Sequence, residues 1–320
     1  MNHNKILAIT LNPALDLTVS TEVIQLGEVN IAQHGTLHAA GKGINVASVL
    51  VDLQMNVTAT GILGANNEQP FTDLFREKNI KNAFCREAGN TRINVKLTES
   101  NQRTTDINLP GIDISSTTLA RFRQTVFDLA EQFKVVVFSG SLPCGISQST
   151  YADLISQVKA LGCLTILDTS GEAFSEAVKA GPTMVKPNRE ELAQWLGRPV
   201  NDVQDEQRAA LKLQSYGIKQ VVVSDGKNGF RWYGENAIYH VTPPKVSMVS
   251  TVGAGDSLVA SLAYGLARGE SPEQTLERAA AISAHAVEQV GVGIVDMNRL
   301  KDLQREVSLT PLTLETLAGE

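Results

Sequence analysis

Cysteine is scarce in this sequence of 320 residues, and the three that occur (Cys85, Cys144 and Cys163) are far apart and form no CxxC pair. An odd, scattered set argues against a disulfide framework and a structural zinc site, and it is typical of a reducing compartment. Long hydrophobic runs are also missing. The apolar stretch at residues 6–9 is too short for a signal peptide or a membrane span, so we expect a cytoplasmic protein.

An excess of positive charge is missing too. Lysine and arginine number 28 against 34 aspartates and glutamates, so the formal net charge is -6. Nothing in this balance indicates nucleic acid or an anionic membrane as a partner. Hydrophobic residues make up 42% of the chain and charged residues 19%, which is typical of a globular protein with one large α/β domain or two ordinary ones.

Short β-branched runs alternate with stretches of helical periodicity along most of the chain. Strands are predicted at residues 6–10, 57–61, 135–138, 164–167, 184–185 and 220–224, with a hairpin at 230–233 and 237–241. Helices are predicted at residues 44–53, 70–78, 147–161, 172–180, 189–196, 205–216 and 272–289, and another begins at residue 254. Repeated β–α units predict a mostly parallel sheet with helices on both faces.

The carboxyl ends of parallel strands meet at one edge of such a sheet, and ligands bind there. Polar residues that follow the predicted strands therefore mark the candidate site. They are Asn12, Ser139, Asp168, Lys186, Asn188 and Ser224.

A second, smaller sheet is predicted from segments that lack helical periodicity. Residues 92–97 alternate strictly, with Ile93, Val95 and Leu97 on one face and polar residues on the other. Residues 104–109 are the predicted hairpin partner of this strand. The β-prone region at residues 15–37 is expected to join the same sheet.

Residues 250–257 read Ser-Thr-Val-Gly-Ala-Gly-Asp-Ser and open an apolar helix. A glycine-rich turn at a helix start presents unpaired N–H groups at the positive end of the helix dipole, where an anion can bind. Taken alone, the motif more often marks a structural helix start with Asp256 as a cap, since short glycine motifs occur by accident.

Three apparent motifs are rejected as functional sites. Residues 35–43 contain Gly-Lys, but Gly43 stands where a P-loop needs a serine or threonine for Mg²⁺. His34 and His38 have the spacing of a zinc pair, but Gly35 replaces the required glutamate, so ordinary surface histidines are expected. Cys144 has no histidine nearby in the sequence and is interpreted as a structural thiol.

Three longer motifs occur in a fixed order: Gly41-Lys42-Gly43-Ile44-Asn45-Val46-Ala47, Asn188-Arg189-Glu190-Glu191, and residues 251–257. With them the chain resembles the ribokinase/PfkB family of carbohydrate kinases over essentially its whole length. The resemblance implies a ribokinase-like α/β fold with a mostly parallel central sheet and helices on both faces. It also implies one kinase domain over residues 1–320, in which residues of about 12–37 and 91–110 form an inserted β lid that often makes dimer contacts.

The resemblance further implies roles for single residues. Asp256 would accept the proton of the attacking hydroxyl, and the amides of Gly253, Ala254 and Gly255 would stabilise the transferring phosphoryl group. The phosphorylated sugar would be bound by Asp16, Gly41, Lys42, Asn45, Arg92, Ser139 and Asp256. ATP would be bound by Lys186, Asn188, Ser224, Gly226, Gly229, Thr251, Gly253 and Gly255. Asn188 and Glu191 would organise Mg²⁺.

Within the family, residues 11–16, 38–43, 91–97 and 139–143 are most similar to those of kinases that convert fructose 1-phosphate to fructose 1,6-bisphosphate with ATP. Kinases of tagatose 6-phosphate or fructose 6-phosphate share much of this pattern and remain alternatives. A non-catalytic sensor of sugar phosphates is an alternative of another class. Asp256 argues against the sensor, because binding alone needs no proton acceptor. A ribose or nucleoside kinase would not need Arg92 and Lys42.

Overall fold

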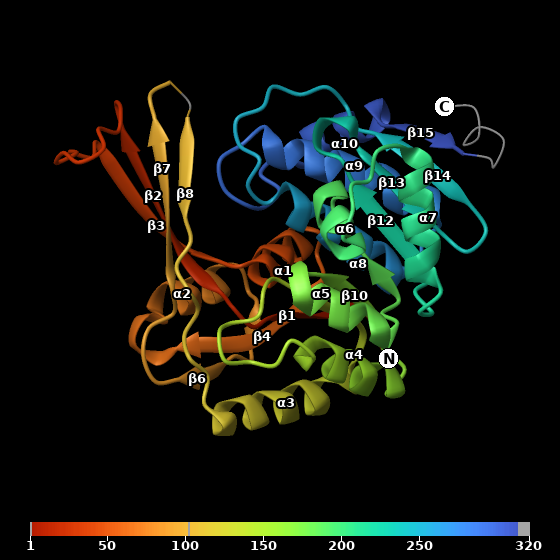
Figure 1. Cartoon of the computed structure of the whole chain (residues 1–320), viewed down its shortest axis with the longest axis horizontal. Helices are drawn as coiled ribbons and strands as arrows, with labels where there is room; N and C mark the ends of the chain where they lie inside the picture. The colour runs from red at the N-terminus through yellow and green to blue at the C-terminus, as the bar shows by residue number, and fades with distance from the viewer. Residues whose placement is uncertain (1, 102, 313–320) are drawn as a thin grey trace.

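The computed structural model describes residues 2–101 and 103–312. Within these residues, the main sheet consists of β1 (Asn2–Thr10), β4 (Asn56–Gly64), β5 (Lys81–Asn82), β6 (Cys85–Glu87), β9 (Phe133–Ser139), β10 (Leu164–Asp168), β11 (Met184–Val185), β12 (Gln220–Ser224), β13 (Phe230–Tyr233), β14 (Ile238–Thr242) and β15 (Ser308–Pro311). Its order is β15-β14-β13-β12-β11-β10-β9-β1-β4-β5, with β6 also paired to β4 (Figure 1). Strands from β12 to β5 pair in parallel, and β13, β14 and β15 add an antiparallel edge.

Helices cover both faces of the main sheet, as the sequence predicted. One layer contains α1 (Lys42–Asp52), α2 (Gln69–Glu77), α8 (Ala254–Arg268), α9 (Pro272–Val287) and α10 (Met297–Glu306). The other contains α3 (Ser116–Ala130), α4 (Thr150–Ala160), α5 (Gly171–Ala177), α6 (Arg189–Leu196) and α7 (Val203–Gln214). Short 3-10 turns lie at η1 (Ala65–Asn67), η2 (Val178–Ala180) and η3 (Gly226–Asn228).

The central strands supply apolar side chains to two separate cores. In β1, Ile6 and Ala8 join the core of the layer that contains α1 and α8, whereas Leu7 and Ile9 join the core of the other layer. This division follows from the strand geometry, because successive side chains point to opposite faces of a sheet. A strand that is buried on both faces reads as a continuous apolar run, and this explains the composition of β1 and β9.

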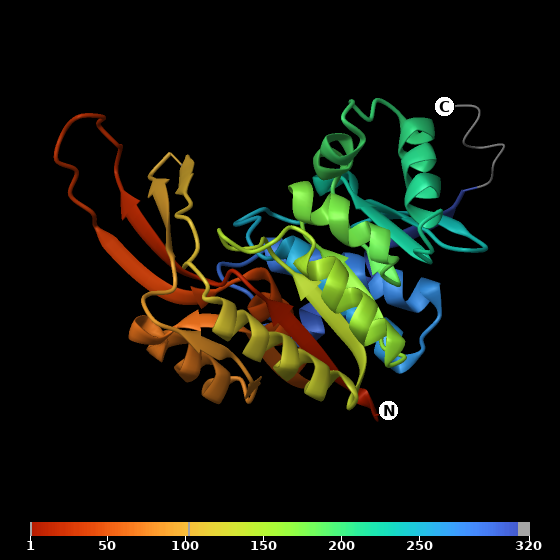
Figure 2. The same cartoon turned by 60° about the horizontal axis from the view of Figure 1, so that its bottom comes forward.

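A second sheet projects from one side of the body (Figures 1 and 2). It consists of β2 (Ala14–Thr21), β3 (His34–Ala40), β7 (Ile93–Glu99) and β8 (Thr104–Ile107), in the order β3-β2-β7-β8. The predicted hairpin is confirmed, because β7 and β8 pair antiparallel. The predicted contrast between a buried and a polar face of β7 is not observed. Its residues 93–98 are all half-buried, because this sheet lacks the two helix layers that cover the main sheet.

Some elements and one thiol differ from the sequence predictions. Five elements were not predicted from the sequence: α3, α10, β5, β6 and β15. Helix α3 carried a readable signal, since its buried residues 118, 122, 126 and 130 recur every four positions. Strands β5 and β6 are two and three residues long, which is too short for any periodicity. The interpretation of Cys144 as a structural thiol is wrong, because Cys144 is exposed.

No helix in the described part of the chain is both long and apolar enough to cross a bilayer. The long helices α8 and α9 instead pack closely against each other within the core. Gly265 in α8 lies directly against α9, because a Cβ atom added there would lie 2.2 Å from Oγ1 of Thr275. A larger side chain at this position would overpack the contact.

We therefore expect Gly265→Ala to destabilise the protein, although alanine favours a helix interior by about 1 kcal/mol over glycine. Overpacking at this contact should cost roughly 1–3 kcal/mol and should outweigh the helix preference. Urea denaturation would measure the free energy of unfolding, and the double variant Gly265→Ala/Thr275→Ala should recover most of the loss. A more stable single variant would contradict the close contact.

Candidate active site

Helix α8 begins at the glycine motif, and the backbone conformation explains the first glycine. Gly253 has φ of 79°, in the left-handed region, and a Cβ atom there would lie 2.6 Å from Cγ2 of Val292. At Gly255 an added Cβ atom would meet only Nζ of Lys186, at 3.8 Å. The first amides of a helix have no carbonyl partner within the helix. The motif therefore presents N–H groups next to a lysine, which is a suitable place for an anion.

Asp256 lies in the first turn of α8 but does not cap it. Its side chain is 7% exposed, and its Oδ2 accepts a hydrogen bond of 2.7 Å from Nδ2 of Asn45 in α1. Burial raises the pKa of Asp256 to about 6, and the charge of Asp168 acts in the same direction. Lys42, Asn45 and Lys186 oppose this rise. Asp256 therefore forms no side-chain capping hydrogen bond, although it lies in the first turn of α8, and its raised pKa brings its change of charge closer to neutral pH.

Asp168, at the end of β10, is buried between two lysines. Its Oδ2 lies 3.3 Å from Nζ of Lys42, and its Oδ1 lies 3.3 Å from Nζ of Lys186. Burial alone would raise the pKa of Asp168, but the two lysine charges hold it below its usual range. In turn, the charge of Asp168 raises the pKa of Lys42. Two fixed ammonium groups thus lie close to Asp256, held by a carboxylate that is 1% exposed.

Asp168 is the site residue that the sequence analysis did not assign. It was recognised as a polar strand exit, but no motif contained it. Its position between β9 and β11 in the sheet brings it beside Lys186, which follows β11. Its neighbour Lys42 comes from the start of α1, more than a hundred residues earlier in the chain. Only the strand order could have identified this ion pair.

The residues expected to bind the sugar fall into two groups. Gly41, the N-cap of α1, has φ of 133° and would place a Cβ atom 3.1 Å from Cα of Pro13. Lys42 and Asn45 follow in α1 and contact Asp168 and Asp256, respectively. At the end of β9, Ser139 is fully buried, and its hydroxyl has no hydrogen-bond partner among the described residues. These residues are brought together at one edge of the sheet.

Arg92 and Asp16 form the second group, at the base of the small sheet. Arg92 lies one residue before β7 rather than on its polar face, which corrects the predicted position. Its guanidinium donates to the carbonyls of Asn12 (3.0 Å), Pro13 (3.3 Å) and Leu109 (3.2 Å). Asp16 accepts a hydrogen bond of 3.1 Å from Asn94, and burial raises its pKa while the charge of Arg92 lowers it.

The residues expected to bind ATP lie on three segments: two adjacent ones at the exits of β11 and β12, and the start of α8. Asn188 and Ser224 form an isolated parallel bridge, and the amide of Ser224 donates to the carbonyl of Pro187 at 3.1 Å. Gly226 has open space around its Cα, whereas a Cβ atom on Gly229 would lie 2.0 Å from the carbonyl oxygen of Val241. Gly229 therefore has a structural reason to be glycine. Thr251 is exposed at the start of the glycine motif.

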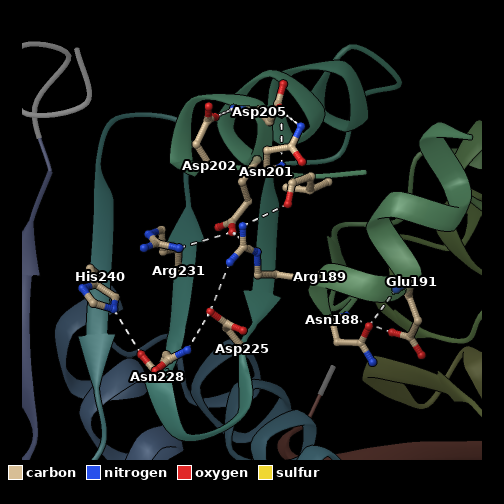
Figure 3. A network of polar contacts seen from close by, with 12 residues as sticks. Asn188, Arg189, Glu191, Asn201, Asp202, Asp205, Asp225, Asn228, Arg231 and His240 are labelled. Atoms are coloured by element: carbon tan, nitrogen blue, oxygen red, sulfur yellow. Dashed lines mark hydrogen bonds and ion pairs between the residues drawn. The ribbon is translucent and has the colours of Figure 1, made fainter. Parts of the chain in front are cut away.

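Asn188 and Glu191 are engaged in a capping box at the start of α6 (Figure 3). Oδ1 of Asn188 accepts from the amide of Glu191 at 2.7 Å, and Oε2 of Glu191 accepts from the amide of Asn188 at 2.8 Å. No cluster of three potential metal ligands occurs within residues 2–101 and 103–312. Mg²⁺ commonly keeps several waters and takes only one or two carboxylates, so the remaining lone pairs of Glu191 fit an indirect magnesium site.

The two histidines of the rejected zinc pair are exposed, as expected. His34 and His38 lie on strand β3 of the small sheet, and no group of three or more potential metal ligands occurs in the part of the chain that the structure describes.

Comparison with known proteins agrees with this geometry. Residues 7–298 match the model of the pfkB family of carbohydrate kinases. The chain is 44% identical over 308 residues to a Vibrio cholerae protein named 1-phosphofructokinase, covering 96% of this chain and 97% of that protein. It is also 44% identical over 307 residues to an Escherichia coli K12 protein of the same name, covering 96% and 98%. A solved structure of Escherichia coli phosphofructokinase-2 in complex with potassium matches with a TM-score of 0.88 and 28% identity, covering 94% of this chain and 98% of that chain.

Fold and site together define an ATP-dependent kinase with the ribokinase-like architecture. The chain belongs to the pfkB family of carbohydrate kinases.

The titration of Asp256 can be tested through stability alone. The pKa of this carboxyl is about 6 in the folded state and about 3.9 in an unfolded chain. A raised pKa contributes stability that is present below the unfolded value and is lost as pH rises through the folded value. Relative to Asp256→Asn, we expect the free energy of unfolding of the wild type to fall by on the order of 3 kcal/mol between about pH 4 and pH 7. Urea denaturation across this range measures the difference, and a constant difference would contradict a buried carboxyl with a raised pKa.

Proposed function

We infer that this chain transfers the γ-phosphoryl group of ATP to fructose 1-phosphate and forms fructose 1,6-bisphosphate. Relatives named 1-phosphofructokinase are 36–44% identical to it, and several of them match over nearly the full chain. The observation that carries the inference is the buried Asp256 carboxylate at a glycine-opened helix start, beside two lysines held by Asp168. This arrangement supplies a base, amides and cations, which are what phosphoryl transfer requires.

In the proposed reaction, Asp256 takes the proton from the 6-hydroxyl of the sugar. The hydroxyl oxygen forms a bond to the γ-phosphorus while the bond from that phosphorus to the β–γ bridging oxygen breaks, and ADP leaves. Asn45 orients the Asp256 carboxylate through its hydrogen bond. The amides of Gly253, Ala254 and Gly255 are proposed to stabilise the charge of the transferring group.

A sugar that already carries a phosphate needs fixed cations. We propose that Arg92 and Lys42 supply them. Three backbone carbonyls hold the guanidinium of Arg92 in position. Because these partners are neutral, the positive charge of Arg92 is not cancelled by them. We propose that Asp16, Gly41, Asn45 and Ser139 contact the sugar hydroxyls. The unpaired, buried hydroxyl of Ser139 supports its part, since an isolated buried polar group is costly.

On the ATP side, we propose that Lys186 binds the phosphates and that Asn188, Ser224, Gly226, Gly229 and Thr251 line the nucleotide. Lys186 is supported by its position beside Gly255 at the start of α8. Asn188 and Glu191 would hold Mg²⁺ through water. The ion would supply neutralisation of the phosphate charge.

Closely related substrates remain the second candidate. A solved relative that is 27% identical to this chain is described as Escherichia coli phosphofructokinase-2 in complex with fructose-6-phosphate. Fructose 6-phosphate and tagatose 6-phosphate would place the existing phosphate at the opposite end of the sugar. A non-catalytic sensor is disfavoured, because binding would not require the buried Asp256.

The substrate claim predicts a ranking of acceptors. With ATP and Mg²⁺, ADP release should be fastest by kcat/KM with fructose 1-phosphate, when compared with fructose 6-phosphate, tagatose 6-phosphate, ribose and adenosine. A charge at the wrong end of the sugar, or no charge, would leave Arg92 and Lys42 without their partner. Preference for any other acceptor would overturn the substrate assignment.

The same assay tests the proposed base with one aspartate variant and uses a second aspartate variant as the control. Asp256→Asn should reduce kcat by roughly 100- to 10,000-fold, the range for loss of a general base, while binding of fructose 1-phosphate measured by calorimetry persists. Asp128→Asn, on the exposed face of α3, should leave kcat unchanged. Near-normal turnover of Asp256→Asn would reject the proposed base.

We propose that the small sheet acts as a lid and that it also pairs two copies of the chain. Closure of a lid excludes water, which would otherwise compete as phosphoryl acceptor. Large apolar side chains between β2 and β3 are exposed in the single chain: Val23 (58%), Leu26 (94%), Val29 (93%) and Ile31 (83%). Such clustered exposure is typical of an interaction surface.

If the lid pairs two chains, sedimentation velocity should show a dimer at micromolar concentration. Leu26→Glu should shift the population to monomer, because a charge would be buried in the contact. A wild-type protein that sediments only as a monomer would contradict this use of the lid. The cytoplasmic location stays a prediction from the sequence.

A further inference from the structure

Beside the site described above lies a second polar network, built around a buried carboxylate that the reaction does not use. Glu206 in α7 is 0% exposed. Its Oε1 accepts from the hydroxyl of Tyr233 at 2.9 Å, and its Oε2 accepts from Nη1 of Arg231 at 3.3 Å. Both partners come from β13, so this part of the network joins α7 to the sheet.

Arg189 connects this buried carboxylate to the surface. Its Nε lies 3.7 Å from Oε2 of Glu206, and its Nη2 donates to the carbonyl of Val200 at 3.1 Å. Its Nη1 lies 3.5 Å from Oδ2 of Asp225. Figure 3 shows the guanidinium of Arg189 directed toward Asp225, whereas Asn188 and Glu191 point toward each other. Arg189 is therefore adjacent to the capping box in sequence but takes no part in it.

Asp225 is the residue that organises the segment after β12. Its Oδ2 accepts from Nδ2 of Asn228 at 3.1 Å, and its amide donates to the carbonyl of Gly229 at 2.8 Å. The carbonyl of Asn228 in turn contacts Nε2 of His240 at 3.2 Å. The side-chain link from this closed turn to α6 is the ion pair of Asp225 with Arg189.

Arg189 also balances the charge of the network. The network contains two carboxylates, Glu206 and Asp225, and two guanidiniums, Arg189 and Arg231. Burial raises the pKa of Glu206, and the negative charge of Asp225 acts in the same direction. Residues 224–229 are proposed to line a nucleotide that carries several negative charges. A carboxylate beside such a polyanion is unfavourable unless a cation neutralises it.

We propose that Arg189 is a positioning residue for ATP: it holds residues 225–229 against the start of α6 and neutralises Asp225. The proposal rests on the proposed function, because it assumes that this segment lines the nucleotide. It assigns to Arg189 no contact with ATP itself. The geometry thus couples ATP affinity to an ion pair that lies outside the reacting groups.

The test measures how Arg189→Met and Asp225→Ala change the KM for ATP. We expect each variant to raise it, Arg189→Met by roughly 3- to 10-fold, the range for a coupled, half-buried pair. The kcat and the KM for fructose 1-phosphate should stay within about twofold of the wild type. In an Asp225→Ala background, Arg189→Met should change the KM for ATP by less than about twofold, since the two effects share one ion pair. Arg189→Lys should restore part of the lost affinity.

The control is Arg198→Met, which removes another half-exposed arginine of the same region. Arg198 pairs with Asp205 at 3.0 Å and does not contact the segment after β12. This variant should leave all three kinetic constants unchanged. Calorimetric titration with ATP alone gives a readout that is independent of the sugar, so a wrong substrate assignment would leave this test intact.

Two results would overturn the proposal. One is a variant at Arg189 that loses thermal stability while the KM and Kd for ATP stay at wild-type values, which is the result of a purely structural role. The other is an effect of Arg189→Met that is as large in the Asp225→Ala background as in the wild type. If Arg189→Met does not fold, Asp225→Ala decides alone, because an unchanged ATP affinity in that variant rejects the link.

Discussion

The buried carboxylate of Asp168 between Lys42 and Lys186 is the interaction on which the rest of the site depends. A charge that is 1% exposed is tolerable only while its partners stay in place, because an unpaired buried charge costs several kcal/mol. The three residues come from β10, from the start of α1 and from the exit of β11. Their attraction therefore fixes two strand ends and one helix start relative to each other, next to Asp256.

The fold makes this arrangement possible through its parallel strands. Since parallel strands end at one edge, the exits of β1, β9, β10, β11 and β12 supply polar side chains to a continuous strip. Helices α1 and α8 begin at the same strip and present their amides to it. The small sheet then extends from the exit of β1, so that Arg92 and Asp16 lie at its base.

Much of the fold was predictable because its signals are local. Continuous apolar runs marked the buried strands, and Ser271 capped α9 as its position in the sequence indicates, accepting from the amide of Gln274. Helix α3 was not predicted, although its buried residues recur every four positions, and neither were β5 and β6, which are too short for a pattern. In the site, the glycine motif and Asn45 were recognised by resemblance. Asp168, the capping box of Asn188 with Glu191, and the network of Arg189 were not.

The sequence by itself determined the class of fold, the burial of the central strands on both faces, and the family. Periodicity and ordered motifs are local signals, because each occurs within a short stretch of chain. Only the tertiary structure decided what each charge faces. Lys42 and Asp168 are far apart in the chain, as are Asn45 and Asp256, and their pairing depends on strand order. The raised pKa of Asp256 is likewise a property of burial and of neighbouring charges, neither of which a sequence contains.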